Sequence, residues 1–184
     1  ALLLMNIISV GLAIFAINYQ LGSYKAVLRW PVNLIDEVKG APLWVMHKDT
    51  SYFQVTHPID SYNLGLIKNI PGVAAVSPLT YRNFLVTNLK SGGNDLYVLF
   101  SVDINSSFAK SQNLSKNDIQ SLRYGKNVIL GKLADSKNTL VAGDFIKINA
   151  LSYRIFKVVK IKNNLKRVNV IYLSLKEMNN IFKT

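Results

Sequence analysis

The chain has 184 residues, a mass of 20.6 kDa, 49% hydrophobic residues, no Cys and a formal net charge of +12. This apolar fraction can fill the core of one ordinary domain, so the composition excludes a disordered or fibrous chain. The absence of Cys excludes a disulfide scaffold, a zinc ribbon and a cysteine nucleophile. The charge is uneven, since residues 1–24 carry no Lys, Arg, Asp or Glu, whereas residues 105–184 carry fifteen of the 22 basic side chains.

The first segment has the pattern of a membrane span. Residues 1–18 are apolar on all sides apart from a few small polar residues, and 18 helical residues cover roughly 27 Å, close to the ~30 Å core of a bilayer. A core helix would be apolar on one stripe only, and no small-x-small cleavage site of a secretory signal follows. The sequence therefore predicts a transmembrane helix with its membrane exit in residues 1–24 and a folded domain in residues 25–184.

The segment after the span carries the aromatic and charged residues that are typical of a membrane interface, from Tyr19 to Trp30. Because a residue before Pro is disfavoured in the α region, Trp30-Pro31 is expected to end the helix. The sequence begins with Ala1 rather than Met, so we expect the helix to start before residue 1. The positive-inside rule applies to short loops, so the charge of the long domain leaves its side of the membrane open.

The first half of the domain is expected to contain two short strands, a helix and a hairpin. The strands are predicted at Leu43–His47 and Tyr52–Val55, and the amphipathic helix at Pro58–Ile70, ended by Pro71-Gly72. Two runs rich in β-branched and aromatic residues, 73–88 and 95–104, flank Ser91-Gly92-Gly93-Asn94 and predict the clearest hairpin of the chain.

The second half is predicted to alternate short strands and turns. Ser115 is expected to cap a helix that reaches Leu122 with Asp118 at its third position, and Ser174 to cap a closing helix with Glu177 at the third position. Strands are predicted at 127–130, 145–148, 153–161 and 168–173, with a helical turn at 131–135 and a turn at 141–144. The predicted fold class is α+β, with mixed strands, a central hairpin and helices packed on one side.

No known catalytic or metal-binding motif is present in the sequence. His47 and His57 lack a second ligand at a metal-binding spacing, no Ser lies in G-x-S-x-G, and the Gly-Lys pairs at 125–126 and 131–132 do not complete a phosphate-binding loop. The one adjacent acidic pair, Asp36-Glu37, points in two directions in any regular structure. We therefore predict no cofactor and no metal, and regard an enzyme as the weaker class.

The strongest charge signal is a basic run with no acid between residues 145 and 175. One interpretation is a solvated face; the functional ones are contact with anionic lipid headgroups or with an acidic partner. Nucleic acid is disfavoured for a membrane-tethered domain, although Tyr153, Phe156 and Tyr172 could stack on bases. The candidate contact residues are Arg154, Lys157, Lys160, Lys162, Lys166 and Arg167.

The order of several motifs resembles the extracytoplasmic, periplasmic-core domain of MacB-type, FtsX-like ABC transporter permeases. The most specific motif is Ile67-Lys-Asn-Ile-Pro-Gly-Val-Ala-Ala-Val-Ser-Pro78, and Trp44 within Leu-Trp-Val is similar to the DevC-like branch. The supporting segments are Ile129–Ala134, Gly143–Ile148, Phe156–Ile161 and Val170–Leu175.

The resemblance implies a mixed α/β domain between two membrane helices, on the extracytoplasmic side of a bacterial inner membrane. It implies a homodimer that is not itself catalytic, an ABC ATP-binding subunit that hydrolyses ATP, and a periplasmic adaptor or membrane-fusion protein. The exported substrate would be a lipid, lipoprotein, peptide, drug or haem. The domain is short, which implies a reduced adaptor-docking lobe, and the later membrane helices are not in this sequence. The residues to which it assigns structural roles are Trp44, Pro71, Gly72, Val73, Pro78, Gly131, Gly143 and Asp144.

Three alternatives from other classes remain open at this point. The first is a membrane-anchored extracytoplasmic sensor or binding domain without transport activity. The second is an anchored hydrolase that uses Asp36 or Asp144. The third is a nucleic-acid binder, whose affinity would fall steeply with salt.

Overall fold

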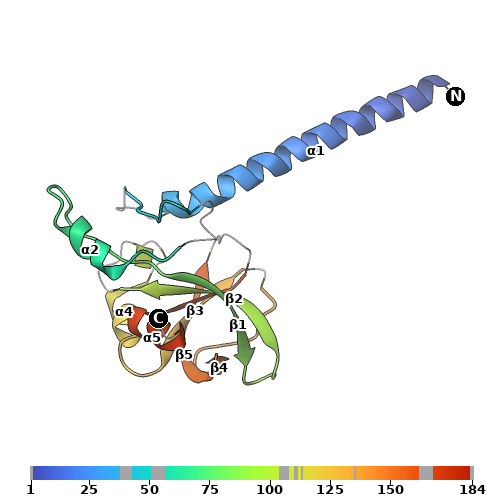
Figure 1. The fold of residues 1–184 in the computed structure, drawn as a ribbon. Coiled ribbons are helices and arrows are strands. Elements are labelled where there is room, and N and C mark those ends of the chain that lie inside the picture. The colour runs from blue at the N-terminus through green and yellow to red at the C-terminus, as the bar shows by residue number, and fades with distance from the viewer. Residues whose placement is uncertain are drawn as a thin grey trace. The chain divides into compact units, whose positions relative to one another are not determined.

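The structure, a computed structural model, describes residues 2–37, 43–50, 57–103, 108–109, 112, 114–134, 136–161 and 168–182. The chain divides into two compact units, Ala1–Glu37 and Val38–Thr184. The first unit is a single helix, and the second contains the strands found among the described residues (Figure 1).

Helix α1 (Leu2–Glu37) is one continuous helix of 36 residues, which corresponds to a length of about 54 Å. The prediction that Trp30-Pro31 ends the helix is wrong, because both residues lie inside α1. A proline inside a helix removes one backbone hydrogen bond and strains the preceding turn, but it does not prevent the chain on either side from remaining helical. The residues after the predicted boundary at 24 therefore continue the same helix.

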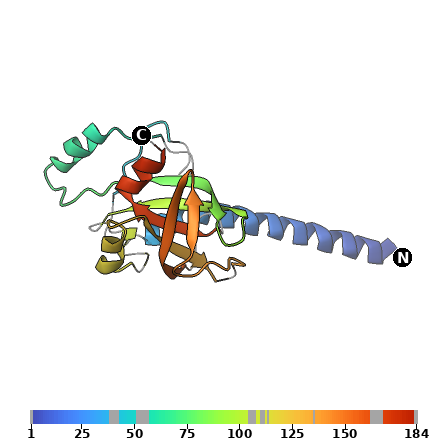
Figure 2. The same ribbon diagram turned by 90° about the horizontal axis from the view of Figure 1, so that it is seen from below.

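The second unit is built on a closed barrel of six strands in the order β1-β2-β6-β3-β5-β4 (Figures 1 and 2). The pairs β2·β6 and β3·β5 are parallel, and the other four pairs are antiparallel. A closed barrel leaves no strand edge open to another chain. The strands are β1 (Tyr81–Asn88), β2 (Asn94–Val102), β3 (Asn127–Leu133), β4 (Phe145–Ile148), β5 (Leu151–Ile161) and β6 (Val170–Ser174).

The α+β class is confirmed, and the structure adds that the strands close into a barrel of which the hairpin β1–β2 is a part. The hairpin itself is confirmed, with Leu85 opposite Leu96. The strand predicted from Val73 begins only at Tyr81, and the helical turn predicted at 131–135 is wrong, since β3 continues to Leu133.

The interior of the barrel is a continuous apolar core that is closed at both ends. Helix α5 (Leu175–Phe182) contributes Met178 and Ile181 to it from one end, and Leu140 enters it from the opposite end, between β3 and β4. The inward-facing strand residues are Val86, Tyr97, Leu99, Val128, Leu130, Ile146, Ile148, Tyr153, Ile155, Ile171 and Leu173.

A second apolar layer covers the outer face of β2 and β6. Phe108 packs against Phe100 of β2, with ring centroids 4.9 Å apart, and against Tyr172 of β6, at 6.5 Å. In helix α4 (Lys116–Ser121), Ile119 is buried as well. Because both faces are covered, β2 is buried at every residue from Tyr97 to Val102, without the alternation of a surface strand.

The part of the second unit that precedes the barrel contains α2 (Ser61–Lys68). This helix is confirmed, although it is shorter than predicted, and Asp60 caps it by accepting the Tyr62 N–H at 3.0 Å. The prediction of a buried strand at Leu43–His47 is wrong: these residues form no strand, and Leu43 is 83% exposed. A strand needs a hydrogen-bonded partner, and none lies beside it in the described residues. The strand predicted at 52–55 lies outside the described residues.

Candidate membrane anchor and basic face

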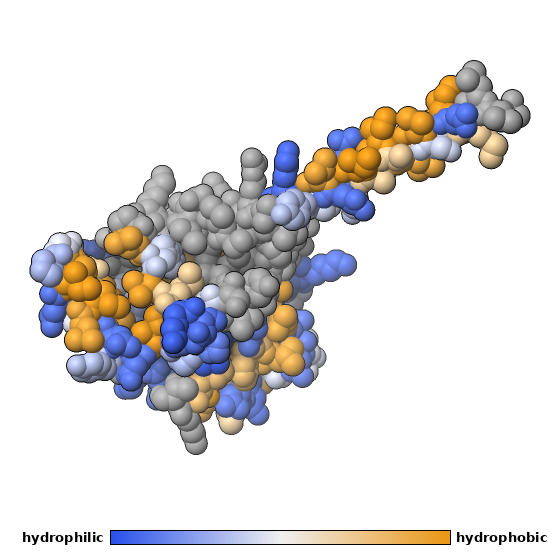
Figure 3. All heavy atoms as spheres, turned by 45° about the horizontal axis from the view of Figure 1, so that its top comes forward, coloured by the Kyte–Doolittle hydropathy of each residue, from blue (hydrophilic) through white to orange (hydrophobic). Residues whose placement is uncertain are grey.

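The candidate anchor is the stretch Met5–Lys25 of α1, whose 21 residues are long and apolar enough to cross a bilayer. Every side chain of this stretch is exposed, and none of its most apolar window is buried in the structure. Figure 3 shows apolar side chains over most of the visible surface of this helix. In water such a surface would be costly, since it is too large and continuous for a soluble surface helix.

The described residues of the basic run, Arg154, Lys157 and Lys160, do not have the same surroundings. Arg154 and Lys160 are exposed on β5, but Lys157 is half-buried and points to α4. The register of β5 against β3 explains this difference. Val128 pairs with Ile155 and the next residue, Ile129, pairs with Lys157, so Phe156 has no partner on β3. This β-bulge changes the alternation of the strand. Lys162, Lys166 and Arg167 lie outside the described residues.

Lys157 forms a tight ion pair with Asp118 of α4. Its Nζ lies 2.8 Å from Oδ2 and 3.0 Å from Oδ1, and the Asp118 side chain is only 8% exposed. Asp118 also completes a capping box, in which the Ser115 N–H donates to Oδ2 at 2.9 Å and Ser115 Oγ accepts the Asp118 N–H at 3.1 Å. The pair thus fixes both the start of α4 and its position against the barrel.

These contacts determine the protonation of Asp118. Burial alone would raise the pKa of this carboxyl above its ordinary 3.8, but the hydrogen bonds from Lys157 and Ser115, together with the Lys157 charge, outweigh burial and lower the pKa. A carboxyl with a lower pKa in the folded chain stabilises the fold above the unfolded value, and this contribution is lost as the pH falls through the folded pKa.

We expect Asp118→Ala to lower the free energy of unfolding by about 2 kcal/mol, because it removes a helix cap and one partner of a partly buried ion pair. Loss of stability between pH 5 and pH 3 should be smaller in this variant than in the parent chain, since the titrating group is gone. Urea unfolding of the full chain in detergent at several pH values measures both effects. The exposed residue Asn117→Ala, one position away, is the control. An unchanged pH dependence in Asp118→Ala would contradict this account.

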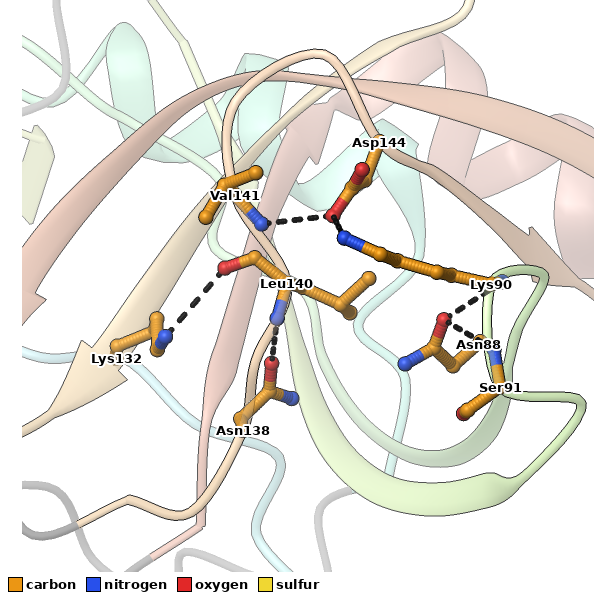
Figure 4. Close-up of polar contacts among 8 residues, drawn as sticks. All are labelled: Asn88, Lys90, Ser91, Lys132, Asn138, Leu140, Val141 and Asp144. Atoms are coloured by element: carbon orange, nitrogen blue, oxygen red, sulfur yellow. Dashed lines mark hydrogen bonds and ion pairs between the residues drawn. The ribbon is translucent and has the colours of Figure 1, made fainter.

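The turn at Gly143-Asp144, one of the predicted structural motifs, organises one end of the barrel (Figure 4). Gly143 has a φ of 98°, a region that L side chains rarely adopt, and Asp144 Oδ2 accepts the Val141 N–H at 3.0 Å. Lys90 Nζ lies 3.9 Å from the same oxygen. The turn aligns β4 with β5, since the Gly143 N–H donates to Ile155 O and the Ile155 N–H to Asp144 O, each at 2.8 Å.

The segment before this turn places Leu140 in the core. Asn138 Oδ1 accepts the Leu140 N–H at 2.8 Å, and Lys132 Nζ lies 3.4 Å from the Leu140 carbonyl oxygen (Figure 4). On the facing hairpin, Asn88 Oδ1 accepts the N–H groups of Lys90 and Ser91 at 2.9 and 3.3 Å. The side chains of Asn88, Asn138 and Asp144 therefore each accept backbone N–H groups within a turn.

The other residues with predicted structural roles have varied surroundings. Gly131 is buried on β3, and a Cβ there would lie 3.1 Å from side-chain atoms of Ile161 and Tyr172. Gly72, with a φ of 90°, forms the turn after α2 together with Pro71. Trp44 is half-buried and is not among the residues of the barrel core, and Val73 and Pro78 are half-buried in extended chain before β1.

Two tyrosine hydroxyls inside the barrel are bound to other polar groups. Tyr153 Oη donates to Glu177 Oε2 of α5 at 2.9 Å, and Tyr97 is hydrogen-bonded to Asn138. Burial raises the pKa of Tyr153, and the hydrogen bond and charge of Glu177 raise it further. Burial also raises the pKa of Tyr97 to about 12, against the smaller opposing effect of Asn138.

We therefore expect a two-phase alkaline titration of the tyrosines in the full chain, followed by absorbance at 295 nm. Tyr97 and Tyr153 should form the late phase and ionise only when the barrel unfolds, because burial raises the pKa of both hydroxyls above the ordinary value of 10. Because their folded pKa values are raised, their contribution to stability is present below pH 10 and is lost as the pH rises above it. Tyr97→Phe is the control, because this variant lacks one of the two late-ionising hydroxyls and should show a smaller late phase. A titration without a late phase would contradict the burial of these two hydroxyls.

The histidines are closer together than their sequence spacing indicated. The rings of His47 and His57 lie 5.4 Å apart between centroids, and His47 Nδ1 is 3.5 Å from Asp49 Oδ2. The described residues hold no group of three or more His, Asp or Glu side chains that could bind a metal ion.

No protein-family model matches the chain, and no curated protein matches it in sequence. Two solved structures are similar to it in fold. The extracellular domain of the noncanonic ABC-type transporter YknZ from Gram-positive bacteria is 14% identical, with a TM-score of 0.48 over 68% of this chain and 67% of that one. The periplasmic region of MacB from Actinobacillus actinomycetemcomitans is 14% identical, with a TM-score of 0.44 over 67% of this chain and 58% of that one.

Both are extracytoplasmic domains of ABC-type transporters. They belong to the class that the sequence motifs resemble, the MacB-type extracytoplasmic domain. This chain spans less than two thirds of the MacB region.

Sequence reasoning missed the ion pair between Asp118 and Lys157 and the role of Leu140 in the core. The two members of the pair are 39 residues apart, and nothing in the local pattern connects them. Lys157 does carry a weak signal, because it follows Phe156 where strict alternation would place a buried residue.

Proposed function

We propose that the chain is the first membrane helix and the extracytoplasmic domain of the permease subunit of a MacB-type ABC exporter. The observation that carries the proposal is the continuous helix α1, whose exposed apolar stretch Met5–Lys25 is followed by 12 further helical residues before the second unit begins at Val38. The motif from Ile67 to Pro78 supports it, since the structure ends a helix and makes a Pro-Gly turn within this motif.

In such a machine the domain acts mechanically. ATP would be hydrolysed by a separate ATP-binding-cassette subunit in the cytoplasm, and the membrane helices would transmit the change to the domain. A barrel that is closed along its edges and filled at both ends suits this role, because a rigid body transmits motion without deforming. The domain would pair with a second copy and, with or without an adaptor protein, move a substrate outward. The side chains that fix the barrel therefore matter more than any nucleophile.

Two measurements on the native membrane protein test this proposal. Purification from membranes should recover an ATP-binding-cassette subunit, identified by mass spectrometry. Residues 1–184 contain no Cys, so a cysteine introduced in Lys116→Cys, at an exposed site of α4, should add labelling by a membrane-impermeant maleimide in intact cells beyond that of the parent protein. Recovery without such a subunit would favour an anchored sensor or binding domain, and labelling only after lysis would place the domain in the cytoplasm.

A further inference from the structure

The outer surface of β4 and the first half of β5 combines exposed aromatic and basic side chains. Strand β4 points Phe145 and Lys147 outward, and β5 points Arg154 and Phe156 outward. Phe145 is 52% and Phe156 46% exposed. The strand register pairs Phe145 with Arg154, and the Leu89 N–H donates to Phe145 O at 3.4 Å. We call Leu89, Phe145, Lys147, Arg154 and Phe156 the aromatic-basic face.

The face differs from the outer side of β2 and β6 in being uncovered. On the outer side of β2 and β6, Phe108 packs against Phe100 and Tyr172, whereas Leu89 remains 48% exposed beside Phe145. The bulge at Phe156 divides the two regions, because it leaves Arg154 and Phe156 outward while Lys157 turns to Asp118. The aromatic-basic face is therefore a distinct surface. Because the barrel is closed, the face has no unpaired strand edge to which a strand of another chain could bind.

The charge of the face is entirely positive. None of the ion pairs among the described residues includes Lys147 or Arg154. The carboxylate that adjoins the face, Asp144, is only 19% exposed and is held by the Val141 N–H and by Lys90. Two exposed cations thus stand beside two exposed phenyl rings without a compensating acid.

We propose that the aromatic-basic face docks onto the surface of an anionic lipid bilayer. Phenyl rings and a leucine side chain gain free energy by entering the headgroup region, and cations beside them are attracted to anionic headgroups. The alternative of a second copy would bring two like-charged faces together. Residues 38–80 separate α1 from β1, which is enough chain for the barrel to reach the membrane that holds α1. Tethering on the same membrane raises the effective concentration of lipid at the face.

The inference rests on the proposed function only in taking α1 as a membrane span. Ser152 offers a probe site that leaves the face intact, since it is exposed on β5 and pairs with Lys147. The full chain with Ser152→Cys, labelled with an environment-sensitive fluorophore, is reconstituted into phosphatidylcholine vesicles with or without phosphatidylglycerol. The vesicles carry a quencher on the lipid headgroup. Asn117→Cys on α4 is the matched control label, because it lies on a different face of the barrel.

We expect quenching of the Ser152 label to be at least about threefold stronger in the anionic vesicles and to fall with added salt, with no such change for the Asn117 label. Reversing both charges, in Lys147→Glu with Arg154→Glu, should remove the effect, since each cation near an anionic surface contributes about fivefold to the docking equilibrium. The same reversal at Lys116 and Lys137, which are exposed elsewhere, should have little effect.

Equal quenching in both vesicle types would overturn the inference. A response of the Ser152 label to soluble polyglutamate, but not to vesicles, would also overturn it and assign the face to an acidic protein. Resistance of the chain to alkaline carbonate extraction reports separately on insertion of α1. If the chain stays inserted and the face does not dock, only this inference fails; if the chain is extracted, the membrane span of the proposed function fails with it.

Discussion

Leu99→Asp is expected to unfold the barrel. Leu99 lies in the middle of β2 with no exposed surface and belongs to the core inside the barrel. A carboxylate at this position would be buried without a partner, which costs several kcal/mol in addition to the lost apolar burial. A loss of this size approaches the entire stability of a small domain, typically about 5–15 kcal/mol. Circular dichroism and urea unfolding of the full chain in detergent measure it.

Two neighbours on the same strand sharpen this test. Leu96 is 46% exposed, so Leu96→Asp should change the free energy of unfolding by less than about 0.5 kcal/mol. Val98 is only 2% exposed although it points to the opposite side from Leu99, because the layer around Phe108 covers the outer face. Val98→Asp should therefore unfold the domain too. A cooperatively folded Val98→Asp variant would show that the outer face of β2 is not covered in solution.

Gly131→Val is expected to lower the free energy of unfolding by about 3 kcal/mol. Gly131 sits on β3 where a Cβ would lie 3.1 Å from Ile161 Cγ2, 3.1 Å from Tyr172 Cε2 and 3.4 Å from Val170 Cβ. Three neighbours on two strands would have to move to accommodate the larger side chain, and overpacking of a filled core typically costs about 1–3 kcal/mol. Thermal unfolding of the full chain in detergent gives the difference.

The control for Gly131 is Gly65, in α2. A Cβ at Gly65 meets nothing within 4 Å, so Gly65→Ala should be neutral or stabilising by about 0.5–1 kcal/mol through the higher helix propensity of Ala. If Gly131→Val were as stable as the parent chain, β6 and the end of β5 would not pack over β3 as closely as the structure places them.

Local signals determined much of the secondary structure of this protein. The Ser115 capping box and the hydrogen bond from the Glu177 N–H to Ser174 Oγ at 3.2 Å depend on residues three positions apart, so both helix starts could be read from the sequence. The Gly-rich turn of the β1–β2 hairpin and the positive φ of Gly143 are likewise set by single residues. The apolar run in α1 needs only its length and composition to be recognised.

Predictions from the sequence alone are wrong where long-range strand pairing outweighs the local preference for a strand or a turn. Leu43–His47 has the composition of a strand, but a strand forms only when a neighbour supplies backbone hydrogen bonds. The local pattern after Leu130 predicts a helical turn, yet pairing with β5 extends β3 to Leu133. In both cases long-range pairing, which no local window contains, decided the outcome.

Only the tertiary structure decided how the basic residues are used and how the core closes. Lys157 and Arg154 belong to one basic run in the sequence. Because of the bulge at Phe156, Lys157 forms an ion pair with Asp118, whereas Arg154 remains exposed. Leu140 becomes a core residue only because β4 and β5 close the sheet on itself. The physical reason is the same throughout: periodicity and caps act over a few residues, whereas barrel closure and ion pairing depend on contacts between strands far apart in the chain.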